Sequence, residues 1–263
     1  MTSTASIHVE LLEGLAVLTM AQPERGNPID DAFTRDFKQV GFDLWNCPTL
    51  RAVLLRAEGP NYSFGGDLKS FYPDRERLGP LVRKWTGDLH MGLQRFWQLP
   101  VPVVTAVQGF AMGGGVGVMA GADVVLAGAS ARIGSAFAQL GFSCDSGSSA
   151  TLTARMGMAR ARRFVMLAEV LDSTQAQQAG LVDHIVADDK LQDEALALAT
   201  KLARGPTLAY GEIKRLFMRA GMSQLSAQLE DEALTLARVS GSRDAQEGIA
   251  AIIEKRKPVF QGR

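Results

Sequence analysis

The sequence has few of the features that mark secreted, membrane or nucleic-acid-binding proteins. Its two cysteines, Cys47 and Cys144, form no pattern, which argues against a disulfide framework and a cysteine zinc site. Lys plus Arg and Asp plus Glu both number 28, so the formal net charge is zero. Such a balance offers no basic surface for nucleic acid or an anionic membrane. The near-zero charge also favours self-association.

Long apolar runs and metal-binding clusters are also absent from the sequence. No uninterrupted run reaches the roughly 18 apolar residues that a membrane span needs, and the N-terminus lacks the pattern of a signal peptide. We therefore expect a cytoplasmic protein. The three histidines form no cluster with carboxylates or cysteines at metal-ligand spacing, so we expect neither a metal nor a separate cofactor.

The order of apolar runs predicts an α/β protein. In the 263 residues, 46% of them hydrophobic, we expect one large core over residues 1–200 and a helical region over 201–263. Residues 72–80 are polar and are expected to be irregular. The elements expected from periodicity are a hairpin over 7–20, strands over 51–57, 103–107, 123–127, 131–133 and 181–186, helices over 31–47, 81–98, 114–122, 148–157, 159–168 and 173–180, and further helices from 189 to the end, broken near Gly205, Gly221 and Gly241.

Two glycine-rich turns are the most informative motifs. Each follows an apolar run that is typical of a buried strand, and the turns are Ser63-Phe64-Gly65-Gly66-Asp67 and Gly109-Phe110-Ala111-Met112-Gly113-Gly114-Gly115. Glycine lets the backbone approach a ligand closely, and a strand that ends in glycines leaves N–H groups unpaired. Two such turns can direct two donors at one oxygen, which is how an oxyanion is stabilised. Tight helix-on-strand packing is the structural alternative.

A dinucleotide-binding reading of the second turn is disfavoured. The residues from Gly115 to Ala120 satisfy the G-x-G-x-x-A pattern after a strand. The fingerprint also requires an acidic residue about 20 positions further on. Phe137 and its neighbours offer none.

The chain resembles the crotonase superfamily, which contains enoyl-CoA hydratases, enoyl-CoA isomerases and related enzymes. The resemblance spans nearly the whole sequence, and its motifs are far more specific than one glycine turn. The stretches that carry it are Pro23-Glu24-Arg25-Gly26-Asn27, Ser63 to Leu68, Pro102 to Gly115, Ala176 to Val182, Glu247-Gly248 and Glu254 to Phe260.

This resemblance implies a spiral of β-β-α units with a C-terminal helical region, assembled as a homotrimer or a dimer of trimers. The backbone N–H groups of Gly66 and Gly114 would hold the thioester oxygen of an acyl-CoA substrate. The coenzyme A part would lie along the Arg25 loop and the backbone of Gly65, Asp67 and Leu68. Lys255, from a neighbouring subunit, would meet the phosphates; a solvated charge in a basic tail is the other reading of this residue.

Departures from the family pattern bear on the reaction. Hydratases of this family use two glutamates, and the corresponding positions here are Gly117 and Phe137, which cannot transfer protons. One aspartate, Asp145, matches the position used by enoyl-CoA isomerases and by the ring-1,2-epoxyphenylacetyl-CoA isomerase. Without the resemblance, Asp145 would be read as a helix N-cap. Beside Phe137 and Phe142 its carboxylate would lose solvation, which raises its basicity.

The predicted activity is therefore acyl-CoA isomerisation, which shifts a 3-enoyl-CoA to a 2-enoyl-CoA with Asp145 as the base. A nucleophilic Asp145 acting on an aromatic or epoxide acyl-CoA is one alternative, and His90 matches a histidine of the aroyl-CoA dehalogenases. A catalytically idle acyl-CoA-binding subunit is another, because Ser146, Ser148 and Ser149 stand where relatives usually have glycines. We expect the segment 70–90 to line the acyl pocket.

Overall fold

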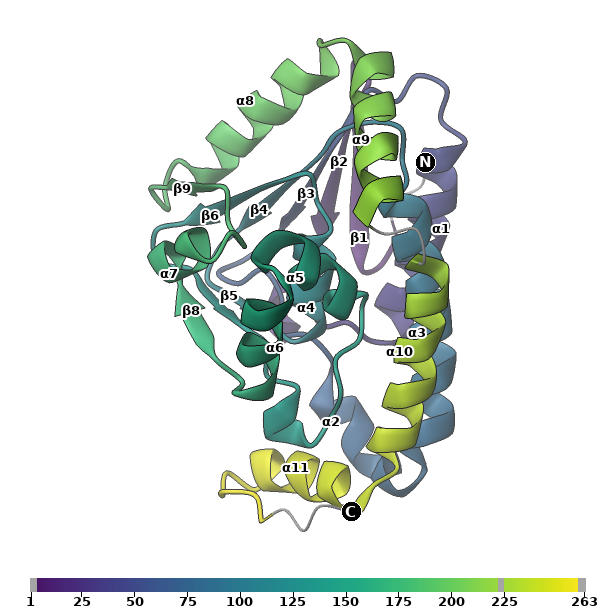
Figure 1. Ribbon diagram of the computed structural model, residues 1–263, viewed down its shortest axis with the longest axis vertical. Helices are drawn as coiled ribbons and strands as arrows, with labels where there is room; N and C mark the ends of the chain where they lie inside the picture. Colours follow the sequence, from purple (N-terminus) through teal and green to yellow (C-terminus); the bar gives the residue numbers. More distant parts are fainter. Residues whose placement is uncertain (1–3, 222–224, 260–263) are drawn as a thin grey trace.

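The fold consists of two sheets surrounded by helices, followed by a C-terminal helical region (Figure 1). The computed structural model describes residues 4–221 and 225–259, apart from the side chains of 219–221, 225–228, 231 and 232. The elements in chain order are β1 (Ile7–Leu12), β2 (Leu15–Met20), η1 (Pro23–Arg25), α1 (Asp31–Trp45), β3 (Ala52–Ala57), α2 (Leu68–Phe71), η2 (Tyr72–Arg77), α3 (Leu78–Trp97), β4 (Val103–Val107), β5 (Phe110–Met112), α4 (Gly114–Ala120), β6 (Val124–Gly128), β7 (Arg132–Gly134), η3 (Ala138–Leu140), α5 (Ser148–Met156), α6 (Met158–Met166), β8 (Val170–Asp172), α7 (Ser173–Gln178), β9 (His184–Val186), α8 (Leu191–Ala203), α9 (Thr207–Gly221), α10 (Leu225–Ser240) and α11 (Arg243–Ile253).

The larger sheet has six strands in the order β1-β2-β3-β4-β6-β9. Strands β1 and β2 form the predicted antiparallel hairpin, and each further neighbour pairs in parallel. The hairpin turn needs two residues at positive φ, and Glu13 and Gly14 adopt φ values of 45° and 92°. Parallel strands require crossovers, which the intervening helices supply.

Both faces of this sheet are covered, so its strands are apolar on both sides. Along β3, Val53 and Leu55 belong to the main core, which also contains Phe33 and Phe37 of α1. Their neighbours Ala52 and Leu54 face the opposite way and pack in a second cluster. Helix α8 closes that second face and lies across the strands in Figure 1.

A second, smaller sheet lies next to the two glycine-rich turns, and Ser63 of the first turn forms a bridge with Ala111 of its strand β5. It has three strands in the order β5-β7-β8, with β5 and β7 parallel and β7 and β8 antiparallel. Strand β5 follows β4 after a short turn, so the chain passes from one sheet to the other before it enters α4. Strands β6 and β7 repeat this passage. The expected spiral of β-β-α units is confirmed.

The C-terminal helices pack on the same chain. Helix α10 lies along α3, and α11 contacts α2, η2 and η3 (Figure 1). The expected helix breaks at Gly205 and Gly241 are confirmed, and α9 ends at Gly221, after which residues 222–224 lie outside the described residues. The boundary predicted after residue 200 falls inside α8, and the chain leaves that helix only at Arg204.

Three local predictions were wrong. Residues 72–80 are not irregular, because η2 and the first turn of α3 occupy them. The strand predicted over 181–186 is formed only at 184–186, since the N–H groups of Leu181 and Val182 bond to the carbonyl of Ala176 at the end of α7. Strands β5 and β8 were not expected; each has three residues and pairs with β7 in the second sheet.

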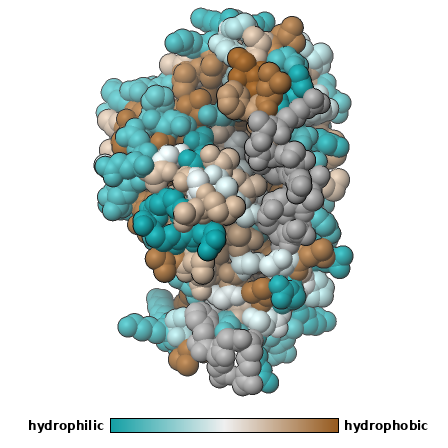
Figure 2. All heavy atoms as spheres, in the orientation of Figure 1, coloured by the Kyte–Doolittle hydropathy of each residue, from teal (hydrophilic) through white to brown (hydrophobic). Residues whose placement is uncertain are grey.

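Helix α9 presents an apolar outer face. Figure 2 shows apolar side chains gathered over the part of the molecule where α9 lies. The exposed residues of this face are Leu208, Ile213, Leu216 and Phe217. Among the described residues, no helix combines the length and apolarity that crossing a bilayer requires.

Candidate active site

The first glycine turn, after β3, is held open by a buried serine. The Ser63 hydroxyl donates to the carbonyl of Asn27 at 2.8 Å and accepts from the N–H of Gly65 at 3.0 Å. The carbonyl of Gly65 accepts from Ile29 at 2.8 Å. Within the described part of the chain, no hydrogen bond involves the N–H of Gly66. This donor is therefore available to a ligand.

The second glycine turn lies directly against the first. Strand β5 bonds to Ser63 on both sides, through Ser63 N to the carbonyl of Phe110 at 3.0 Å and Met112 N to the carbonyl of Ser63 at 2.9 Å. A Cβ at Gly65 would lie 2.7 Å from the Met112 oxygen and 3.2 Å from the Gly114 nitrogen. Only glycine fits there, where φ is +78°.

Gly114 supplies the second free donor. It is the first residue of α4, so its N–H has no acceptor inside the helix. No other described residue accepts from it. The unpaired amides of Gly66 and Gly114 thus lie on adjacent turns, and these two residues are the donors that the family resemblance implies.

Asp145 lies beside this pair, on the loop between η3 and α5. Its Oδ1 is 3.5 Å from the position that a Cβ on Gly114 would occupy. Burial raises the pKa of the carboxyl to about 6, and a hydrogen bond from the Ser146 hydroxyl opposes part of this rise. The N-cap reading is wrong: Gly147 is the N-cap of α5, and no described side chain caps this helix. The carboxylate thus remains available to a substrate.

The two hydratase glutamate positions offer no proton-transfer group. Phe137, the residue before η3, is buried, with 6% of its surface exposed. At Gly117, a Cβ would lie 2.7 Å from the carbonyl oxygen of Ser146 and 2.8 Å from its Cβ. The loop that carries Asp145 therefore fills the space into which a longer side chain at 117 would project.

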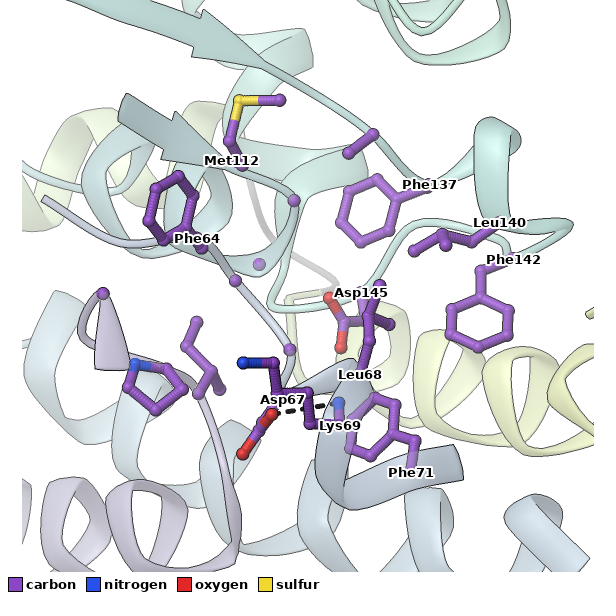
Figure 3. Close-up of a pocket in the computed structure, with 18 of the residues that line it drawn as sticks. Phe64, Asp67, Leu68, Lys69, Phe71, Met112, Phe137, Leu140, Phe142 and Asp145 are labelled. Atoms are coloured by element: carbon purple, nitrogen blue, oxygen red, sulfur yellow. Dashed lines mark hydrogen bonds between the residues drawn. The ribbon is translucent and has the colours of Figure 1, made fainter. Parts of the chain in front are cut away.

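Gly66, Gly114, Phe137 and Asp145 border one cavity of about 910 Å³ (Figure 3). Asp145 lies among apolar side chains in Figure 3, with Phe137, Leu140 and Phe142 on one side and Leu68 and Phe71 on the other. The predicted site residues that line the cavity are Arg25, Gly65, Gly66, Asp67, Leu68, Gly114, Phe137, Phe142, Asp145 and Lys255.

Arg25 holds the first turn in place as well as lining the cavity. Its guanidinium bonds to Asp67 at 2.5 Å and to Asp30 at 2.8 Å. Asp67 in turn caps α2 by accepting from the N–H groups of Lys69 and Ser70. Two lysines, Lys69 and Lys255, also line the cavity. Neither of them forms an ion pair within the described residues.

Two predicted placements differ in the structure. Lys255 was expected to come from a neighbouring subunit, but it lines the cavity of its own chain, because α11 packs on α2 and η3. His90 does not line this cavity. Its ring is buried near the Leu229 backbone of α10, and its Nε2 has no hydrogen-bond partner among the described residues. Burial lowers its pKa to about 4, so the ring is neutral.

Helix α11 and the loop before Asp145 are in backbone contact. A Cβ at Gly248 would lie 2.4 Å from the carbonyl oxygen of Leu140. A Cβ at Gly141 would lie 2.9 Å from the carbonyl carbon of Asp244. Glycines on both sides permit this approach, which places Ile252 and Ile253 on the cavity lining.

The sequence correctly predicts that the segment 70–90 lines the cavity but does not identify which side chains do so. One face of α3 contributes Val82, Trp85, Thr86 and Leu89, which follow the helical i, i+3, i+4, i+7 spacing. Trp85 stacks on Phe71 with ring centroids 5.1 Å apart. The helical spacing of these residues could have identified them as one face of a helix. It does not reveal that this face lines the cavity.

Comparisons with known proteins agree with this arrangement. The model of the enoyl-CoA hydratase/isomerase family matches residues 10–263. A probable enoyl-CoA hydratase of Rhodobacter capsulatus is 34% identical over 98% of both chains. The 1,2-epoxyphenylacetyl-CoA isomerase of Escherichia coli is 33% identical over 97% of both chains.

Solved structures show the same fold. An enoyl-CoA hydratase from Mycobacterium avium subsp. paratuberculosis superposes with a TM-score of 0.88, at 26% identity, over 98% of this chain and 99% of its own. The chain belongs to the enoyl-CoA hydratase/isomerase family, whose members act on acyl-CoA thioesters. The expected crotonase fold is confirmed, and the chain is an enzyme of that family.

Proposed function

We propose that this enzyme is an acyl-CoA isomerase that converts a 3-enoyl-CoA to a 2-enoyl-CoA. Asp145 removes a proton from C2, and the charge moves to the thioester oxygen as an enolate. The amides of Gly66 and Gly114 donate to that oxygen. Asp145 then returns the proton at C4. One base serves both carbons, so the reaction needs no second carboxylate.

The observation that carries this proposal is one carboxylate of raised pKa beside two unpaired amides. A pKa of about 6 leaves the base mostly ionised at neutral pH and gives it more basicity than an ordinary aspartate. The absence of a proton-transfer group at Gly117 and Phe137 argues against the usual hydration of a double bond. One oxyanion donor typically contributes about 3–4 kcal/mol to lowering the barrier.

The coenzyme A arm of the substrate would leave the cavity past Arg25, Lys69 and Lys255. The two lysines offer ammonium groups to phosphates, while Arg25 steadies the turn that carries Gly66. The reaction requires no metal and no separate cofactor, since coenzyme A is part of the substrate. Among the described residues, no group of three or more His, Cys, Asp or Glu could hold a metal ion.

The proposal is tested by incubating the protein with 3-hexenoyl-CoA, crotonyl-CoA and 4-chlorobenzoyl-CoA and identifying products by mass and chromatography. We expect 2-hexenoyl-CoA from the first and no product from the others. The Asp145→Asn variant should lose about 10²–10⁴-fold in kcat while still binding a CoA ester by calorimetry. Asp193→Asn, on the exposed side of α8, is the control. Near-wild-type turnover by Asp145→Asn would refute the base role.

A second candidate has Asp145 as a nucleophile, or as a base, on an aromatic or epoxide acyl-CoA. The described residues that line the cavity include the five aromatic side chains Phe64, Phe71, Trp85, Phe137 and Phe142, which suit a ring-shaped acyl group. The similarity to the Escherichia coli isomerase adds support. Turnover in ¹⁸O-labelled water separates the roles, because hydrolysis of an ester at Asp145 leaves the label in the carboxylate.

Assembly as a trimer or a dimer of trimers also remains a proposal. The apolar face of α9 supports it, since four large side chains there are exposed in the single chain. Light scattering of the Phe217→Glu variant tests whether this face joins copies. A smaller mass than wild type is expected, and an unchanged mass would exclude α9 from the interface.

A further inference from the structure

The residue after Asp145 has a strained backbone. Ser146 is fully buried and has φ of +53°, a left-handed conformation that glycine adopts without cost and serine does not. The next residue, Gly147, is also left-handed, with φ of +67°. A buried serine kept at such a position is a reason to ask what its side chain does.

The Ser146 side chain lies between the two halves of the site. Its hydroxyl donates to Oδ1 of Asp145 at 3.0 Å. Its Oγ is 2.9 Å from where a Cβ on Gly114 would be, and its backbone is packed against Gly117. Gly114 and Gly117 share one face of α4, and their missing side chains leave the space that Ser146 occupies. The serine is therefore held against the turn that supplies one of the free amides.

We propose that Ser146 is a positioning residue for the Asp145 carboxylate. By donating to Oδ1, the hydroxyl fixes the rotation of the carboxylate relative to Gly114 and leaves Oδ2 to exchange the proton with substrate. A hydrogen bond to the charged form also stabilises it, which limits the rise in pKa that burial causes. The left-handed backbone is what directs the hydroxyl back to the preceding residue. This inference rests on the proposed base role of Asp145.

The test compares Ser146→Gly and Ser146→Ala with Ser148→Ala. Glycine removes the hydroxyl and relieves the backbone, whereas alanine removes the hydroxyl and keeps the strain. The Ser148 hydroxyl donates to the backbone carbonyl of Asp145 and not to its carboxylate, which makes it a matched control. In both Ser146 variants, we expect the pKa that governs the acid limb of the kcat/KM profile to rise by about one unit. We also expect kcat to fall about tenfold. KM should change little.

Thermal unfolding separates positioning from folding. Ser146→Gly should unfold at the wild-type temperature or above it. It should still lose activity, because the hydroxyl that positions the carboxylate is absent. Equal pH profiles for wild type and both Ser146 variants would overturn the inference, as would an equal shift in Ser148→Ala.

A second readout does not depend on turnover. In protein labelled with ¹³C at the aspartate carboxyl, the Asp145 signal is assigned by its loss in Asp145→Asn and titrated directly. A pKa raised in both Ser146 variants supports the inference even if no isomerase substrate is found, and an unmoved pKa contradicts it. If Asp145→Asn keeps full turnover, the base role fails, and the titration still shows whether Ser146 holds the carboxylate.

Discussion

The amides of Gly66 and Gly114 and the carboxylate of Asp145 belong to regions that are held in different ways. The amides follow strands of two sheets and are fixed by backbone hydrogen bonds around Ser63. The carboxylate stands on a loop between η3 and α5, supported by side chains and by α11. In the first region Gly65 leaves no room for a side chain, whereas the loop of the second region brings the side chains of Asp145 and Ser146 to the cavity. A change of reaction within this fold is therefore expected in the loop and not at the amides.

The largest effect should follow from removing one amide. Gly114 is the first residue of α4, a helix position that tolerates proline because the missing N–H costs no helical bond. Both Gly114→Pro and Gly114→Ala add bulk next to Ser146, but only proline removes the donor. We expect kcat of the proline variant to fall about 10²–10³-fold below that of the alanine variant. Equal kcat values in steady-state assays would contradict the oxyanion role.

The loop region should respond to pH. With a pKa of about 6, the ionised fraction of Asp145 falls from about nine-tenths at pH 7 to about one-tenth at pH 5, so kcat/KM should drop roughly tenfold. The folded chain also binds this proton more readily than the unfolded one. Wild type should therefore lose stability relative to Asp145→Asn as the pH rises from about 4 to about 6. A flat rate between pH 5 and 7 would contradict the base role.

The contact between the regions can be tested at Gly117. A Cβ there would press on Ser146, and overpacking costs about 1–3 kcal/mol, while the helix propensity of alanine returns up to about 1 kcal/mol. Gly117→Ala should lower the free energy of unfolding in urea by about 1–2 kcal/mol. Gly87→Ala, where nothing lies within 4 Å, should not lower it and is the control. Unchanged stability of Gly117→Ala would show that the loop carrying Asp145 and Ser146 shifts at little cost to accommodate the added methyl group.

The smallest effect is expected at the outer part of the cavity. Exposed ion pairs contribute roughly 0.2–1 kcal/mol, so Lys255→Ala should raise KM about 1.4- to fivefold and leave kcat unchanged. The difference in KM between wild type and Lys255→Ala should decrease at high salt. Lys257→Ala is the control, because Lys257 is exposed and does not line the cavity. Equal KM values for the two variants would remove Lys255 from coenzyme A binding.

The sequence predicts the amide half of the site better than the loop half. Strand ends followed by glycines are local patterns, so the two turns are found from neighbouring residues alone, and the family resemblance then singles out Gly66 and Gly114 within them. Strand β5 is missed because its three residues gain their order from β7, which lies later in the chain. The contacts of Asp145 depend on Gly117 and α11, which no pattern near residue 145 reveals. The family resemblance, and not spacing, identified Asp145 as a site residue.

The backbone contact of α11 with Leu140 and Gly141 ties the far end of the chain to the centre of the site. Sliding of the helix past the loop would open that contact. Substitutions on the buried side of α11 should then alter turnover as well as binding, although α11 contributes no reacting group. Helix α11 is, in this respect, a support for the loop that carries Asp145.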